Sequence, residues 1–180
     1  MKARAPKMGA WLFPRGAQFW FNSVLVCAVA TGLLAGCASQ PIILPAVGPQ
    51  NLATDYGRHG EGRLQVFTET DEFEVSQDVP YFPHRDYWIY SADQKRIKRV
   101  WNSENHEDET PTIVSLPAGS YEIRADAEFY GPVRVPVVIR ANRLTKVVLQ
   151  PGYMPGLNVA DSDLVRMPDG YVVGWRALEP

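Results

Sequence analysis

The densest group of side chains that could do chemistry lies in the segment ENHEDET, residues 104–110 of this 180-residue chain. It combines His106 with four carboxylates within six residues: Glu104, Glu107, Asp108 and Glu109. Oxygen-rich loops suit Ca²⁺. However, the spacing differs from that of an EF-hand, and the segment contains no glycine to shape a coordinating loop. We therefore predict a solvated hairpin loop that discourages edge pairing, with calcium binding at His106–Glu109 as the alternative.

An enzyme would need a nucleophile, a base and an acid that can meet in one cleft. The three histidines, His59, His84 and His106, lie in different segments, and none is paired in sequence with a nucleophile. The chain has no nucleophile elbow, Gly-rich phosphate loop, CxxC pair or HExxH helix. We predict no catalytic residue, no cofactor and no metal ligand, so the chain is not expected to be an enzyme. His84 is expected to hold a loop by hydrogen bonds.

The position of Cys37 is more informative. Residues 1–18 hold four basic side chains and no acid, and an almost uncharged run of 16 residues follows over 19–34. A basic start followed by a short apolar run describes an export signal. A membrane-spanning helix needs roughly 20 residues, so a short N-terminal anchor is only the alternative. Small residues and a cysteine then end the run, in the order Leu34-Ala35-Gly36-Cys37.

These four residues resemble the lipobox of bacterial lipoproteins. The resemblance implies that residues 1–36 are a signal peptide, cleaved between Gly36 and Cys37, and that Cys37 is acylated. Two or more acyl chains hold a protein stably on a membrane. In that family an aspartate after the cysteine favours the inner membrane. Ala38 therefore implies the outer membrane, facing the periplasm, or the cell membrane if the organism has no outer membrane.

Processing at Cys37 also sets the charge and redox chemistry of the mature chain. Cys27 would be discarded, so no intramolecular disulfide could form. The mature chain would keep 14 basic and 20 acidic residues, a net charge of −6. This balance argues against nucleic acid as a partner. The next segment, 37–62, is rich in proline and glycine without a helical or strand period, which indicates a flexible tether.

Alternation of apolar and polar residues predicts strands over most of the remaining chain. The clearest cases are YEIRADAE (121–128) and VRVPVVIR (133–140), each with a period of two. Pro136 cannot donate to a ladder, so the second strand is predicted at an edge or with a bulge. Five further runs are rich in strand-forming residues: 63–70, 86–92, 96–102, 111–116 and 143–150. Seven short strands without a helical period predict a single all-β domain over 63–152, an antiparallel sandwich.

Residues 114–152 resemble the carboxypeptidase-regulatory-like, or prealbumin-like, β-sandwich domains. The shared pattern is a Leu-Pro-Ala-Gly turn, an alternating strand, an aromatic-Gly-Pro turn and a Val-rich hairpin. Residues 81–111 also resemble uncharacterised bacterial lipoproteins that carry such a domain. The resemblance implies a seven-stranded Greek-key sandwich, with a hairpin joining 133–140 to 143–150. It departs at Ala141-Asn142, where the family usually has glycine. Such domains generally act as accessory or adhesive modules without catalytic residues.

The C-terminal extension, 153–180, is predicted to form a separate β-hairpin after the sandwich. Two strand-prone runs flank Pro168-Asp169-Gly170, a good hairpin turn. Val165 and Met167 are expected to share an apolar face with Val172 and Trp175. Because an isolated hairpin is marginally stable in water, it is predicted to pack against the sandwich.

Aromatic residues provide the best argument about function. Six of them gather within 21 residues: Tyr81, Phe82, Tyr87, Trp88, Tyr90 and Trp101. Strand alternation sends Trp88 and Tyr90 to one face and Tyr87 to the other. Tyr87, Trp88, Tyr90 and Trp101 are therefore candidate ligand-binding residues. We predict a lipid-anchored envelope module that acts through protein–protein contacts. The alternative is a carbohydrate-binding module for cell-wall or surface polysaccharide.

Overall fold

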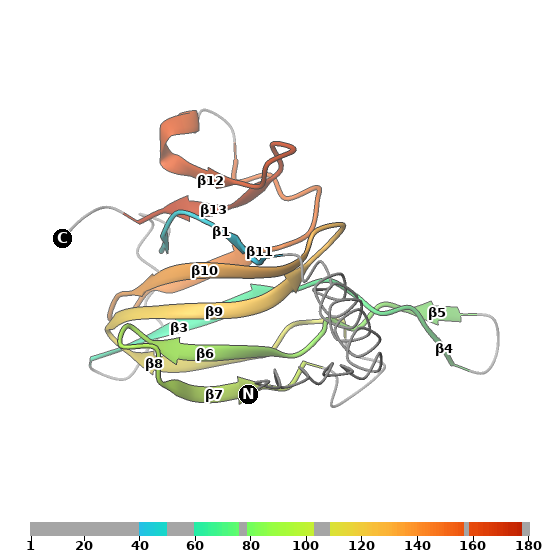
Figure 1. Ribbon diagram of the computed structural model, residues 1–180, viewed down its shortest axis with the longest axis horizontal. Helices are drawn as coiled ribbons and strands as arrows, with labels where there is room; N and C mark the ends of the chain where they lie inside the picture. The colour runs from blue at the N-terminus through green and yellow to red at the C-terminus, as the bar shows by residue number, and fades with distance from the viewer. Residues whose placement is uncertain (1–39, 50–59, 76–78, 103–108, 157–158, 178–180) are drawn as a thin grey trace, which may run out of the picture. The chain divides into compact units, whose positions relative to one another are not determined.

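The computed structural model describes residues 40–49, 60–75, 79–102, 109–156 and 159–177 (Figure 1). Residues 1–39, with the signal segment and Cys37, residues 50–59 of the predicted tether, with His59, and residues 103–108, with His106, lie outside the described residues. All described residues belong to one structural unit, 40–180.

Two sheets form the main layers of this unit. The larger has the order β12-β13-β2-β10-β9-β6-β7, and β1 also pairs with β10. Its strands are β1 (Ile42–Ile43), β2 (Val47–Gly48), β6 (Tyr87–Ser91), β7 (Arg96–Val100), β9 (Gly119–Ala127), β10 (Gly131–Ile139), β12 (Leu164–Arg166) and β13 (Val172–Arg176). The smaller sheet has the order β11-β3-β8. Its strands are β3 (Glu61–Phe67), β8 (Ile113–Pro117) and β11 (Leu144–Val148).

Alternate residues of the two sheets meet between the layers. From the larger sheet, Ile123 of β9 and Val133, Val135 and Val137 of β10 are almost fully buried. They join Leu64 and Val66 of β3 and Val147 of β11 in one apolar core. Figure 1 shows β3 and β8 behind the layer formed by β10, β9 and β6. The predicted all-β sandwich is therefore confirmed, and the seven predicted core strands are all present.

Strand pairing differs from the predicted antiparallel arrangement, because both sheets are mixed. The predicted hairpin between 133–140 and 143–150 is wrong: β11 lies in the smaller sheet and pairs with β3 in parallel. The turn itself is as expected, since Asn142 adopts a φ of 59°. Its backbone N–H donates to Glu61 O at 2.8 Å, which ties the turn to β3. Two strands that each have one apolar face can face each other across a core as well as share a sheet.

The predicted tether also begins with ordered strands. Within residues 41–49, β1 pairs with β10 in parallel, and β2 pairs with both β10 and β13. Leu44 and Val47 are buried in the core. Strands of two residues, separated by Pro45, are too short to produce a period in the sequence, which explains why this stretch resembles a tether.

Pro136 is not on an edge strand, because β10 has β9 on one side and β1 and β2 on the other. The β9–β10 register is continuous from Gly131 to Ile139, so no bulge is present. Arg134 O accepts from Leu44 N, which faces the N-terminal strands. Alternate residues turn their polar groups to the same side, so the Pro136 nitrogen also faces that side. At Pro136 the strand beside β10 changes from β1 to β2. The ladder therefore needs no hydrogen bond from a backbone N–H at this position.

The C-terminal hairpin forms, but its predicted apolar face is wrong, because Val165 and Met167 enter the core with Val173 whereas Trp175 shares a face with Leu164. Leu164 lies opposite Trp175, and Val165 opposite Gly174. The turn closes when Gly170 N donates to Met167 O, and Gly170 has a φ of 98°. The hairpin extends the larger sheet through β2, and Val165, Met167 and Val173 enter the core. A 3₁₀ turn, η1 (Asp161–Asp163), precedes it.

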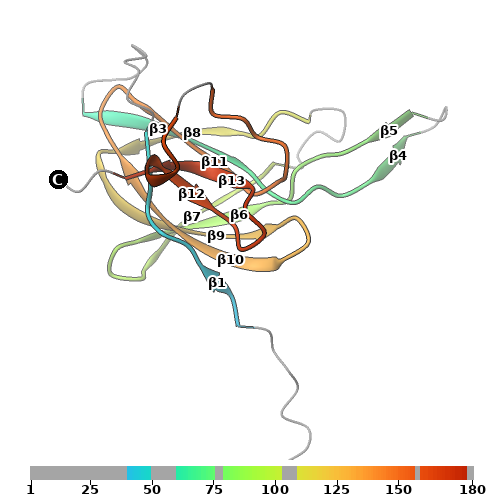
Figure 2. The same cartoon turned by 90° about the horizontal axis from the view of Figure 1, so that it is seen from above.

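A second hairpin, β4 (Phe73–Val75) with β5 (Val79–Tyr81), belongs to neither sheet. It extends away from the sandwich in both views (Figures 1 and 2). It arises from the chain between β3 and β6.

Candidate functional site

A row of side chains crosses the outer surface of the larger sheet. Cross-strand pairing places Arg134 of β10 beside Arg124 of β9, Arg124 beside Trp88 of β6, and Trp88 beside Arg99 of β7. Directly opposite residues point to the same face of a sheet. A second row runs alongside and consists of Pro136, Glu122, Tyr90 and Arg96. We call this surface, with Trp101 after β7, the aromatic–arginine face.

Guanidinium groups stack on the rings of this face. The Arg99 guanidinium carbon lies 3.8 Å from the centre of the Trp101 ring and 5.5 Å from that of Trp88. Arg96 lies 4.6 Å from the Trp88 centre, and Arg124 lies 3.8 Å from the Tyr90 centre. All these distances are within the range of cation–π attraction. The rings and cations therefore form one continuous layer.

Carboxylates hold two of these arginines in place. Arg99 donates to Asp86 at 3.0 Å, and Asp86 also accepts the Asn102 backbone N–H at 2.9 Å. Arg124 donates to Glu122 at 2.6 Å and also to Gln94. Burial opposes ionisation of Glu122, but hydrogen bonds from Arg124 and Gln94 hold its pKa below the ordinary value. These contacts orient the cations before any ligand arrives.

The structure separates the predicted ligand-binding residues. Trp101 is 48% exposed, and Trp88 and Tyr90 are half-buried on the outer face. Tyr87 is only 1% exposed and faces the core, so it cannot contact an external ligand as predicted. Its hydroxyl has no hydrogen-bond partner among the described residues, and burial raises its pKa. The alternation that assigned Trp88 and Tyr87 to opposite faces is confirmed.

A shallow hollow lies at one end of this face, between β6, β9, β10 and the start of β1. It has a volume of about 340 Å³. Its wall includes Pro41, Asp86, Trp88, Arg124, Asp126 and Arg134. An aromatic wall with two cations and two anions can receive a polar side chain of a partner.

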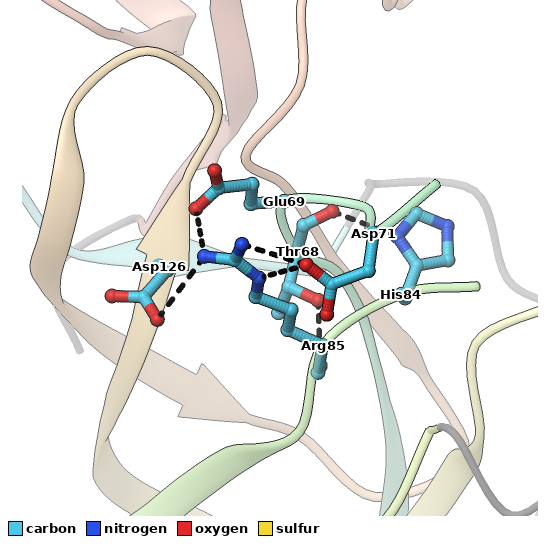
Figure 3. Close-up of polar contacts among 6 residues, drawn as sticks. All are labelled: Thr68, Glu69, Asp71, His84, Arg85 and Asp126. Carbon is cyan, nitrogen blue, oxygen red and sulfur yellow. Dashed lines mark hydrogen bonds and ion pairs between the residues drawn. The ribbon is translucent and has the colours of Figure 1, made fainter. Parts of the chain in front are cut away.

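A separate polar cluster joins the ends of β3 and β6 (Figure 3). Arg85 lies 2.7 Å from Glu69, 2.6 Å from Asp71 and 4.0 Å from Asp126. Burial raises the pKa of the Glu69 carboxyl, although Arg85 opposes the shift. Thr68 Oγ1 donates to Arg85 O at 2.7 Å. The cluster fixes the base of the β4–β5 hairpin against the larger sheet.

His84 belongs to the same junction and holds a loop by a hydrogen bond, as predicted. The Nδ1 atom of its buried ring lies 2.7 Å from Thr68 O. The ring meets Phe67 edge-on, with the centroids 5.3 Å apart. Burial lowers the pKa of His84, although the Thr68 contact opposes the shift.

Within the described part of the chain, no group of three histidine, cysteine, aspartate or glutamate side chains is placed to hold a metal ion. Glu109, at the described end of the acidic loop, accepts the Phe82 backbone N–H at 2.9 Å. The rest of the predicted calcium loop lies outside the described residues. The described residues also contain no helix long and apolar enough to cross a membrane.

Comparisons with protein-family models, curated proteins and solved structures found no match to the chain. The resemblances to bacterial lipoproteins and to prealbumin-like domains therefore rest on the residues quoted for them.

The arginines are the part of this face that the aromatic pattern alone missed. The signal was present in the sequence, because Arg124 alternates with buried Ile123 and Ala125. Arg96 and Arg99 likewise lie in a run of exposed residues that ends at buried Val100. Which arginine stacks on which ring depends on the strand register, which no local pattern contains.

Proposed function

We propose that this protein is a lipid-anchored, non-enzymatic module of the cell envelope that binds a protein partner through the aromatic–arginine face. The observation that carries the proposal is the layer formed by Trp88, Tyr90 and Trp101 with three stacked arginines. Tryptophan, tyrosine and arginine are the residue types that contribute most to binding at protein interfaces.

The orientation of the arginines supports a protein partner. Arg99 and Arg124 are already fixed by Asp86 and Glu122, so less conformational entropy is lost when a partner binds. The mixture of cations and carboxylates around the rings resembles the polar rim of an interface. The hollow beside Trp88 gives a partner side chain a place to insert into the sheet surface.

Polysaccharide binding is the second candidate, and the exposure of Trp101 favours it. Sugars stack on open ring faces. Here Arg99 stacks on Trp101, Arg96 on Trp88 and Arg124 on Tyr90, each over one side of a ring. A protein partner can use the guanidinium groups directly, whereas a sugar would need the ring side that they leave open.

The proposed anchor is the acylated Cys37, and the proposed location is the outer membrane, on its periplasmic side. The sequence Leu34-Ala35-Gly36-Cys37 supports it, together with the basic and apolar stretches that precede it. Metabolic labelling with a radioactive fatty acid, compared between the native chain and Cys37→Ser, tests this part. Equal labelling of both chains would contradict it.

Site-specific crosslinking in intact cells tests the face. A photoreactive amino acid is placed at Arg96, on the face, and in a control chain at Lys98. Lys98 is exposed on the same strand but lies opposite Ile89, whose side chain points to the other side of the sheet. We expect an adduct from position 96 that is absent from position 98 and is degraded by protease. An adduct degraded only by glycan-cleaving enzymes would favour polysaccharide, and equal adducts at both positions would contradict the proposal.

A further inference from the structure

The turn between β9 and β10 exposes a large apolar side chain in a strained conformation. Phe129 is 81% exposed and has a φ of 67°. Bulky residues rarely adopt this left-handed region, where glycine and asparagine are favoured. The turn is ordered, because Tyr130 N donates to Ala127 O at 3.0 Å. Neither the strain nor the exposure of Phe129 is explained by packing within the sandwich.

A second exposed apolar residue lies on the neighbouring strand. Ile43 of β1 is 69% exposed. Because it lies opposite Arg134 of β10, its side chain points to the aromatic–arginine face and not to the Phe129 turn. Pro41 and Pro132 line the same hollow, so the start of β1 lies beside the start of β10. Figure 2 shows β1 running beside β10 at this side of the sandwich.

The position of Cys37 brings the acyl chains close to this place. Only residues 38–41 separate Cys37 from β1. From Cys37 to Ile42 the chain advances five residues, which span at most about 18 Å even when fully extended. If Cys37 lies at the bilayer surface, the start of β10 must lie near the headgroups. Because β1 and β2 belong to the folded domain, the segment between Cys37 and the first strand is only residues 38–41, much shorter than the predicted tether of residues 37–62.

We infer that the protein docks on the bilayer through the β9–β10 turn, with Phe129 inserted at the boundary of headgroups and acyl chains. The inference rests on the acylation of Cys37 in the proposed function. Aromatic side chains favour this depth of a membrane. The anchor keeps the turn at a high effective concentration near lipid, so a small apolar contact is enough for binding.

The charges around the turn select the kind of lipid surface. Asp126 and Glu128 precede Phe129 in the chain, Glu69 and Asp71 are paired with Arg85, and Arg134 lies farther along β10. These carboxylates oppose attraction to anionic headgroups. The occupant is therefore a zwitterionic lipid surface entered by the Phe129 side chain, and added anionic lipid is not expected to strengthen insertion.

This docking leaves the aromatic–arginine face free. The strands of the larger sheet run away from the turn, so the row with Trp88 and Arg124 comes first and the row with Tyr90 and Glu122 lies farther along. A protein partner could reach the face while the end of the sheet contacts lipid. The two proposals therefore concern different surfaces.

An environment-sensitive fluorophore tests the insertion. After processing, the one cysteine of the chain is Cys37, whose thiol carries lipid, so a thiol-reactive dye labels only a cysteine that is introduced. The emission of a dye on Phe129→Cys is compared with that of a dye on Met154→Cys. Met154 is 86% exposed and lies between β11 and β12. Mass spectrometry first verifies that each variant is acylated. The labelled proteins are then bound to phosphatidylcholine vesicles.

We expect a blue shift and a several-fold rise in emission at position 129 but not at 154, with quenching by lipids that carry a quencher near the headgroups. Equal emission at both positions on acylated protein would overturn the docking and leave the proposed face intact. A chain without the acyl mass would overturn the docking together with the anchor. Retention of the far-ultraviolet circular dichroism spectrum shows that each variant is folded.

Discussion

Arg99 stacks on Trp101 with its guanidinium carbon 3.8 Å from the ring centre, and the same guanidinium is bound to Asp86 at 3.0 Å. The ion pair of Arg99 with Asp86 joins the end of β7 to the residue that precedes β6. It shows how the face combines an aromatic ring with a cation whose direction is already set. Its removal should therefore affect recognition more than folding.

Arg99→Ala is expected to lower the crosslinking yield from position 96 about tenfold, as for a residue at the centre of an interface. The free energy of unfolding should change by less than about 1 kcal/mol, because the pair with Asp86 is partly exposed. Lys98→Ala removes a cation from the same strand and serves as the control. Equal losses of yield for both variants would contradict a specific role of the stacked arginine.

Tyr87→Phe should leave the protein as stable as before or stabilise it by up to about 1 kcal/mol, because the buried hydroxyl lacks a partner among the described residues. Tyr121→Phe is the comparison, since that hydroxyl donates to Pro117 O at 2.9 Å. It should lower the free energy of unfolding by about 0.5–1.5 kcal/mol. Denaturant unfolding measures both, and a clear loss of stability for Tyr87→Phe would show that its hydroxyl has a partner.

His84 should make stability depend on pH. Burial lowers its pKa below the ordinary value of 6.5, so the unfolded chain binds a proton more readily than the folded chain. The free energy of unfolding should therefore fall as the pH drops through 6.5, and level off below the lowered pKa. His84→Gln should show a smaller loss between about pH 7.5 and about pH 5.5. Identical losses for both proteins would exclude His84 as the cause.

Gly174→Ala should destabilise the protein by about 1–3 kcal/mol, the usual range for overpacking. An added Cβ would lie 2.7 Å from Val47 Cγ1 and 2.8 Å from Lys146 O. Gly119→Ala is the control, because its added Cβ would come no closer than 3.7 Å to Tyr121. A normal melting temperature for Gly174→Ala would indicate that the C-terminal hairpin is not packed on β2.

Phe129→Gly should stabilise the protein in solution by about 0.5–1 kcal/mol, because relief of the left-handed strain exceeds the entropy cost of glycine. In acylated protein on phosphatidylcholine vesicles, the same change should weaken contact of the turn with lipid. Limited proteolysis at the turn, with and without vesicles, measures that contact. Vesicle protection that is equal in the native chain and the variant would contradict the docking.

Alternation within single segments could be predicted because it is a local property of an extended chain. Successive side chains of a strand point to opposite faces, which was enough to send Ile123 and Ala125 inward and to place Trp88 and Tyr90 on the face opposite Tyr87. The turn at Asn142 and the hairpin around Gly170 were likewise predictable from the residues that tolerate a positive φ. The three aromatic residues of the face, Trp88, Tyr90 and Trp101, were among the predicted candidates, whereas its arginines were not.

Pairing between distant segments was decided only by the tertiary structure. The sequence by itself determined an all-β chain, its seven core strands and its C-terminal hairpin, but not β1, β2, β4 or β5. The fold decided that β11 joins β3, that the stretch around Val47 completes the sheet beside β10, and that Pro136 lies in its interior. It also aligned Arg134, Arg124, Trp88 and Arg99 in one row. The physical reason is that a strand's apolar face says which side is buried, whereas its neighbour and register depend on how all the strands share one core.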